Sequence, residues 1–214
     1  MAEVSIIRSG LTLAIIAAIC TALVALTYSA TRERIEANER AWLEQSLAPA
    51  LSGLFFDSAV TESPITIPAP HQLPGSEDAI IYRVYSGETP VAALFVVNAR
   101  DGYAGPIRLL VGVDVNGVVT GVHALAHRET PGLGDRIERT KSDWLERFDG
   151  RSLGSPSANA WKISPDDGYF DQLTGASVTS RAVVKAVRQT LAYFAANEEM
   201  IFSATATDEE EVAP

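Results

Sequence analysis

Residues 171–180 read Asp171-Gln172-Leu173-Thr174-Gly175-Ala176-Ser177-Val178-Thr179-Ser180, and a helical pattern follows them. Small side chains and hydroxyl groups therefore stand at the beginning of a helix. The free N–H groups and the positive end of the helix dipole at such a position favour an anionic group such as a phosphate. A hydroxyl there can bind a phosphate or be joined to one covalently, although the same residues can also act only as a helix cap.

The helix itself is predicted over Arg181–Asn197. Its apolar residues recur at the spacing of one helical face: Val183, Val184, Val187, Leu191 and Phe194. Upstream, four runs have the composition of strands: 79–85, 91–98, 106–114 and 118–126. Asn116-Gly117 between the last two runs predicts a hairpin. The pattern indicates an α+β fold, with a twisted, mainly antiparallel sheet flanked by helices.

A second motif follows the last predicted strand directly and reads His127-Arg128-Glu129-Thr130-Pro131-Gly132-Leu133-Gly134-Asp135. Its proline and glycines predict a tight loop, because glycine adopts positive φ without steric cost. Glu129 and Thr130 would project from a rigid loop, the usual place for ligand contacts. An ordinary turn closed by the threonine hydroxyl is the alternative. A metal site on His127, Glu129 and Asp135 would have no recognised spacing.

Composition limits the possible functions. The chain has 214 residues and a net charge of −10, enough for one domain with accessory segments, and its acidity argues against nucleic-acid binding. Cys20 is its only cysteine, so the chain alone cannot build a conventional iron–sulfur centre, a cysteine-rich zinc site or an intrachain disulfide. Any redox function therefore needs an organic cofactor.

Residues 9–31 predict a transmembrane helix that follows a short N-terminal end, residues 1–8. No charged residue lies between Arg8 and Arg32, and about 20 apolar residues cross a hydrocarbon core. A buried core helix and a signal peptide cleaved after Ala30 are the alternatives. Three arginines follow the span and one precedes it, which by charge alone would place the rest of the chain in the cytoplasm.

The remaining segments predict accessory structure. Residues 32–56 are expected to form a helical juxtamembrane stalk that packs on the domain. Prolines in 57–78 predict an extended connector, and 201–214 read as an acidic disordered tail. Thr140 with Asp143 can cap a short helix that carries Trp144, Leu145 and Phe148.

Two motifs together resemble a known family. The Asp-x-x-Thr-Gly-Ala-Ser-x-Thr pattern of residues 171–179 is similar to the flavinylation signature of FMN-binding domains, in which the FMN phosphate is esterified to a threonine side chain. Tyr103-Ala104-Gly105-Pro106-Ile107 and the stretch from His127 to Ile137 resemble the G subunit of the Rnf electron-transport complex. The Glu-Thr-Pro-Gly-Leu-Gly run also occurs in the C subunit of the sodium-pumping NADH:quinone reductase. The resemblance covers the chain up to about Asn197.

The resemblance implies the residues of a flavin site. Ser177 takes the attachment position, where the family usually has threonine, and Thr179 is the alternative hydroxyl. Asp171 would be read by a magnesium-dependent transferase that moves FMN from FAD. The other residues implied to bind the cofactor are Thr174, Gly175, Ala176, Glu129, Thr130, Gly132, Leu133 and Gly134. No catalytic residue and no metal ligand is expected.

The resemblance also implies a function and a place in the cell. The chain is expected to be a flavoprotein of the inner membrane with a single span and a periplasmic FMN-binding domain, residues 79–200. It would relay electrons within an ion-translocating ferredoxin:NAD⁺ oxidoreductase whose other subunits hold iron–sulfur centres. Export opposes the arginine count, but large domains translocate largely regardless of nearby charge.

Three other functions remain open from the residues alone. They are a component like the C subunit of the sodium-pumping reductase, a membrane-tethered module that binds a ligand without redox chemistry, and a hydrolase that uses Ser177. The last lacks a Gly-x-Ser-x-Gly elbow.

Overall fold

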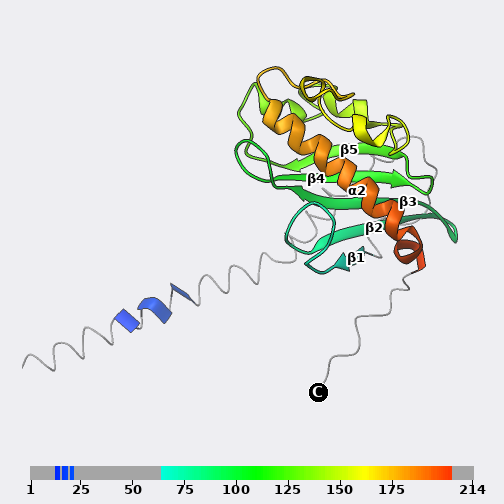
Figure 1. Ribbon diagram of the computed structural model, residues 1–214. Coiled ribbons are helices and arrows are strands. Elements are labelled where there is room, and N and C mark those ends of the chain that lie inside the picture. Colours follow the sequence, from blue (N-terminus) through cyan, green and yellow to red (C-terminus); the bar gives the residue numbers. More distant parts are fainter. Residues whose placement is uncertain (1–12, 15, 19, 22–63, 204–214) are drawn as a thin grey trace, which may run out of the picture. The chain divides into compact units, whose positions relative to one another are not determined.

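The computed structural model describes residues 13–14, 16–18, 20–21 and 64–203 (Figure 1). The described residues between 13 and 21 are helical. Within these ranges, no helix has the length and apolar character needed to cross a membrane. Most of the predicted span at 9–31, the end at 1–8, the stalk at 32–56 and the tail beyond Ser203 lie outside the described residues.

The domain is built on a five-stranded antiparallel sheet whose strands follow one another in chain order. The strands are β1 (Pro64–Ile67), β2 (Ala79–Ser86), β3 (Thr89–Ala99), β4 (Ile107–Asp114) and β5 (Val119–Ala126). The predicted hairpin joins β4 to β5, and Gly117 has a φ of +75° there. The Asp114 carboxylate closes this turn by accepting hydrogen bonds from the N–H groups of Asn116 and Val118. The four predicted strands and their antiparallel pairing are confirmed.

β1 was not expected, because its residues fall in the proline-rich stretch 57–78. Pro64–Ile67 pairs with Ala79–Tyr82 of β2 at the edge of the sheet. Proline lacks an N–H group, yet it is tolerated at the first residue of an edge strand, as at Pro64. Part of the stretch interpreted as a connector therefore belongs to the sheet.

One long helix, α2 (Ser177–Ser203), lies across one face of the sheet (Figure 1). It begins four residues before the predicted start at Arg181 and extends into the segment predicted as tail. The rings of Phe95 on β3 and Phe194 on α2 meet edge to face, with centroids 6.2 Å apart. This contact lies in the core that α2 and the sheet share.

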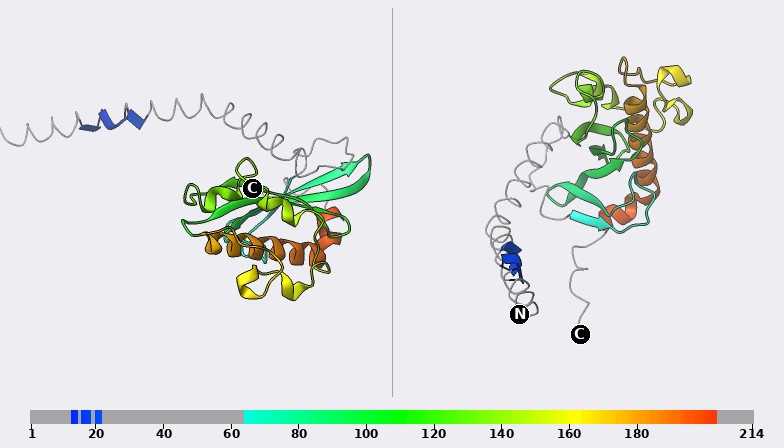
Figure 2. Two further views of the ribbon diagram at one scale, coloured as in Figure 1. Left: turned by 90° about the horizontal axis from the view of Figure 1, so that it is seen from above. Right: turned by 90° about the vertical axis from the view of Figure 1, so that its left-hand side faces the viewer.

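The chain between β5 and α2 is held by short 3₁₀ helices and an aromatic cluster. The helices are η1 (Gly134–Ile137), η2 (Trp144–Phe148), η3 (Ala158–Ala160) and η4 (Ser164–Asp166). The segment with η3 and η4 lies on the same side of the sheet as α2 (Figure 2). Phe148 stacks on Phe170 with centroids 4.7 Å apart.

The capping prediction for the short helix at Trp144 was wrong. η2 is a 3₁₀ helix preceded by Asp143, whose side chain forms no capping hydrogen bond. The hydroxyl oxygen of Ser142 accepts a hydrogen bond from the Trp144 N–H at 3.3 Å. The hydroxyl that contacts the start of η2 is therefore that of Ser142 and not that of Thr140.

Candidate functional site

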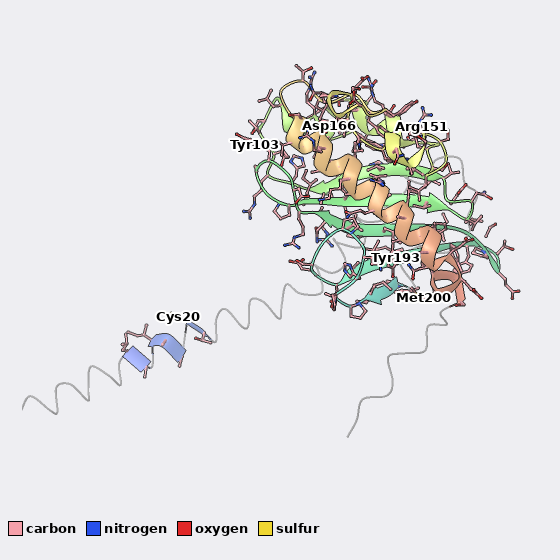
Figure 3. The ribbon with its side chains drawn as sticks, in the orientation of Figure 1. Cys20, Tyr103, Arg151, Asp166, Tyr193 and Met200 are labelled. Atoms are coloured by element: carbon pink, nitrogen blue, oxygen red, sulfur yellow. The ribbon has the colours of Figure 1, made fainter. Side chains whose placement is uncertain are left out.

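The two sequence motifs meet at one cavity of about 330 Å³. It opens between the loop after β3, the glycine loop after β5 and the first turn of α2. Its lining residues are Tyr103, Glu129, Thr130, Leu133, Gly134, Gly175, Ala176, Ser177, Val178 and Thr179. Two of the residues implied by the resemblance, Thr174 and Gly132, are not among them. Figure 3 shows Tyr103 at the end of the domain where α2 begins.

The glycine loop is closed by backbone atoms. The carbonyl oxygen of Thr130 accepts hydrogen bonds from the N–H groups of Leu133, Gly134 and Asp135, at 3.1, 3.1 and 3.3 Å. Gly132 has a φ of +78°, a conformation that side-chain-bearing residues rarely adopt. Its role is therefore to turn the loop, which presents Glu129 and Thr130 to the cavity.

Glu129 joins the glycine loop to the helix. Its side chain is almost fully buried, with 4% of the residue exposed. One carboxylate oxygen, Oε2, accepts a hydrogen bond from the Thr179 hydroxyl at 2.5 Å, and Oε1 accepts one from the Ala104 N–H at 3.1 Å. These two bonds connect the carboxylate to both other walls of the cavity.

Two glycines make room for this carboxylate. A Cβ atom on Gly134 would lie 2.8 Å from Glu129 Oε2 and 2.9 Å from Thr179 Oγ1. A Cβ atom on Gly102 would lie 2.9 Å from Glu129 Oε1 and still closer to a backbone oxygen. Side chains at these positions would displace the carboxylate, so the glycines are required by close approach.

The three hydroxyl groups at the start of α2 have different surroundings. Thr179 is 1% exposed, and its hydroxyl is committed to Glu129. The Ser180 hydroxyl is buried, accepts a hydrogen bond from the Leu173 N–H and donates one to the Ala176 carbonyl. Ser177 is half-buried at the cavity, and no described residue forms a hydrogen bond with its hydroxyl. Of the three, only Ser177 offers a free hydroxyl to a ligand.

The lining of the cavity combines exposed apolar side chains with polar groups. Tyr103, Leu133 and Val178 are large apolar side chains that line it and remain exposed. The first residues of α2 also line it, and the first N–H groups of a helix have no partner within the helix. The arrangement suits a ligand that carries a flat apolar ring and an anionic group.

Asp171 lies outside the cavity, on the approach to α2. Its carboxylate forms an ion pair with Arg147 and accepts a hydrogen bond from the Ser164 hydroxyl at 3.1 Å. The hydrogen bond and positive charge of Arg147 lower the pKa of the Asp171 carboxyl. Its backbone oxygen accepts a hydrogen bond from the Trp144 indole at 2.7 Å. The side chain is therefore fixed and charged, while most of it remains exposed.

The three residues considered as metal ligands point to different partners. His127 Nε2 lies 3.2 Å from the Glu138 carboxylate, and Asp135 pairs with Lys141 at 2.8 Å. Glu129 is committed to Thr179 and Ala104. Within the described part of the chain, no group of three potential ligands converges as a metal site requires.

Comparison with known proteins identifies the family. A model of the FMN-binding domain matches residues 102–192, which include every residue lining the cavity, and a model of the RnfG N-terminal region matches residues 1–49. The G subunit of the ion-translocating oxidoreductase complex of Shewanella amazonensis is 41% identical over 91% of this chain and 90% of its own length. The chain belongs to this G-subunit family.

Other members of the family are similarly close. The protein of the same name from Pseudoalteromonas atlantica is 38% identical over 94% of this chain and 93% of its own length. That of Pseudomonas aeruginosa is 40% identical over 93% of both chains. The resemblance deduced from the two motifs is confirmed along nearly the whole chain.

Sequence reasoning missed three contributors to the site: Gly102, Tyr103 and Val178. Gly102 precedes the recognised Tyr103-Ala104-Gly105 motif and gave no signal of its own, although it borders Glu129. Val178 lies between the two hydroxyl-bearing residues of the helix start and lines the cavity. A helical projection of residues 174–181 would have placed Val178 on the exposed side, but not beside the glycine loop.

Proposed function

We propose that this chain carries FMN covalently on Ser177 and uses it to pass electrons within an ion-translocating oxidoreductase complex. The observation that supports the proposal best is the free Ser177 hydroxyl on the first residue of α2, inside a cavity lined by both motifs of the family. The cavity volume falls in the range of ligand sites, roughly 300–1,000 Å³. The helix N-terminus would stabilise the negative charge of a phosphodiester.

The geometry favours Ser177 over Thr179 as the attachment residue. Modification of Thr179 would require its hydroxyl to leave Glu129 and to reach solvent from a position that is 1% exposed. Ser177 needs neither change. Because serine has the same hydroxyl as threonine, its presence at this position preserves the chemistry.

The attachment reaction needs a second protein. The Ser177 oxygen would form a new bond to the FMN phosphorus of FAD while the pyrophosphate bond breaks, AMP leaves, and the hydroxyl proton passes to a base. The carboxylate lining the cavity is that of Glu129, and both of its oxygens already accept hydrogen bonds. We therefore assign the base and the FAD to a magnesium-dependent FMN transferase.

Asp171 is the proposed contact for that transferase. It lies six residues before Ser177, is exposed, and is held in place by Arg147 and Ser164. A fixed carboxylate six residues before the acceptor serine gives another protein a defined point of recognition. Because Asp171 does not line the cavity, we assign it no direct contact with the flavin.

Covalent attachment suits an electron carrier that must approach its partners. The mouth of the cavity is open, so a flavin bound there would stay accessible, and the phosphoester link would prevent its loss. Thr130 and the N–H groups around the cavity would tune its potential through local contacts. Iron–sulfur centres would belong to other subunits, because this chain has one cysteine.

The proposal includes membrane attachment through residues 9–31, as a single span of the inner membrane with the domain in the periplasm. The support is the uncharged sequence between Arg8 and Arg32. Alkaline phosphatase fused after residue 203 should be active. Activity of a reporter that works only in the cytoplasm, fused at the same position, would contradict the periplasmic placement of the domain.

The attachment site can be tested by co-expressing the full chain with the transferase. After denaturing electrophoresis, the wild-type band and a Ser177→Thr band should show flavin fluorescence. The Ser177→Ala band should show no flavin fluorescence, because this substitution removes the hydroxyl to which FMN would be attached. Fluorescence retained by the alanine variant would move the attachment to another residue.

A further inference from the structure

Buried apolar residues lie on both faces of the sheet, but α2 accounts for only one face. Residues on the face that α2 covers belong to one core cluster, which includes Phe95. On the opposite face, six apolar residues are 0–7% exposed and lie outside that cluster. They are Tyr82, Val84, Ala92, Leu94, Val96 and Leu110.

These six residues form one continuous patch, called here the far-face patch. Strand pairing places Tyr82 opposite Leu94 on β2 and β3, and Val96 opposite Leu110 on β3 and β4. Side chains alternate between the faces along a strand, so Leu94 and Phe95 point in opposite directions. An antiparallel sheet with one solvated face would carry polar residues there. The far-face patch is apolar, as expected of a covered surface.

The part of the chain preceding β1 has the right position and composition to cover the patch. Residues 44–63 directly precede β1 in the chain. Those residues include Leu47, Leu51, Leu54, Phe55 and Phe56. We propose that residues 44–63 pack against the far-face patch. The described helix that packs on β3 and β4 is α2, which lies on the other face (Figure 2).

The dimensions allow this packing. Strands are about 4.8 Å apart, so the distance from β1 to β4 is about 14 Å. A segment of about 20 residues spans about 30 Å even when helical. The segment leads directly into β1, which is the neighbour of β2, the first strand that carries residues of the patch. Residues 44–56 also end the predicted stalk, so these contacts would fix the direction in which the chain leaves the domain.

Thiol accessibility in the full-length chain tests the proposal. In a Cys20→Ser background, Leu94→Cys and Phe95→Cys place single thiols on neighbouring residues of opposite faces. Both should resist a maleimide in the native chain. Adding Leu51→Asp, Leu54→Asp and Phe55→Asp should abolish the protection of the thiol at position 94 alone, because α2 still covers position 95. Continued protection of position 94, or reactivity there in the native chain, would overturn the proposal.

A crosslink gives an answer even if the triple substitution unfolds the domain and exposes both thiols. A benzoylphenylalanine at position 82, in place of Tyr82, should upon illumination attach to a peptide within residues 44–63. Attachment only to other peptides would contradict the proposal. Neither measurement involves flavin, so its outcome is independent of the attachment at Ser177.

Discussion

The Thr179 hydroxyl donates a hydrogen bond to the buried carboxylate of Glu129, 2.5 Å away in space and 50 residues away in sequence. This bond joins the glycine loop after β5 to the first turn of α2. It also commits one of the two hydroxyls that could carry the cofactor. The pair therefore both shapes the cavity and leaves Ser177 as the available attachment residue.

Thr179→Val should destabilise the domain by about 1–3 kcal/mol, because it leaves a buried carboxylate oxygen without its donor. Urea unfolding measures the change, and Thr179→Ser, which keeps the hydroxyl, is the matched control. The valine variant should still acquire flavin at Ser177. Unchanged stability would mean that the carboxylate does not depend on this bond.

Gly134→Ala should lower stability by about 1–3 kcal/mol and reduce the amount of flavin attached, since its Cβ would meet the Glu129 carboxylate at 2.8 Å. Gly154→Ala is the control. Its Cβ would have its nearest neighbour 3.9 Å away. Thermal unfolding and flavin absorbance per chain report the two effects. Equal behaviour of the two variants would show that the carboxylate can move at little cost.

Asp171→Asn should slow flavin transfer by the FMN transferase without unfolding the domain. The exposed carboxylate loses its charge, while the indole of Trp144 still has its backbone acceptor. The rate of flavin incorporation at limiting transferase measures the effect, and circular dichroism checks the fold. A wild-type rate would remove Asp171 from the recognition element.

His123 should make stability depend on pH. Burial, with a contribution from the positive charge of Arg139, lowers its pKa from 6.5 to about 4. The unfolded chain therefore binds a proton on His123 near pH 6.5, while the folded chain does so only near pH 4. As the pH falls from about 6.5 to about 4, the unfolded chain binds the extra proton, so the free energy of unfolding should decrease by on the order of 2 kcal/mol. His123→Gln, which cannot be protonated there, should lose less over the same interval, as measured by urea unfolding. Parallel curves for the two proteins would contradict the lowered pKa.

Local sequence patterns predicted most of the fold. The strand runs, the Asn116-Gly117 turn and the amphipathic pattern of α2 each depend on residues close together in the chain. β1 escaped prediction because prolines signal irregular structure, and the edge position that tolerates Pro64 is a property of the assembled sheet. The contact of Ser142 with the start of η2 was missed because a pattern at Thr140 and Asp143 does not reveal which hydroxyl reaches the backbone.

The candidate site could be predicted as two motifs but not as one cavity. Each motif can be recognised in the sequence from its glycines and hydroxyl-bearing residues. The bond between Glu129 and Thr179 depends on how the first turn of α2 lies beside the glycine loop after β5, and spacing along the chain does not encode that. The same holds for Gly102, whose need for a small side chain appears only once Glu129 is placed beside it.

The attachment of FMN is tested most directly by peptide mass spectrometry on the full chain extracted from its native membrane. Most copies of the peptide containing Ser177 should carry one FMN joined through its phosphate, with fragmentation placing the added mass on Ser177 and not on Thr179. An unmodified Ser177 peptide in complexes that still transfer electrons would contradict the account.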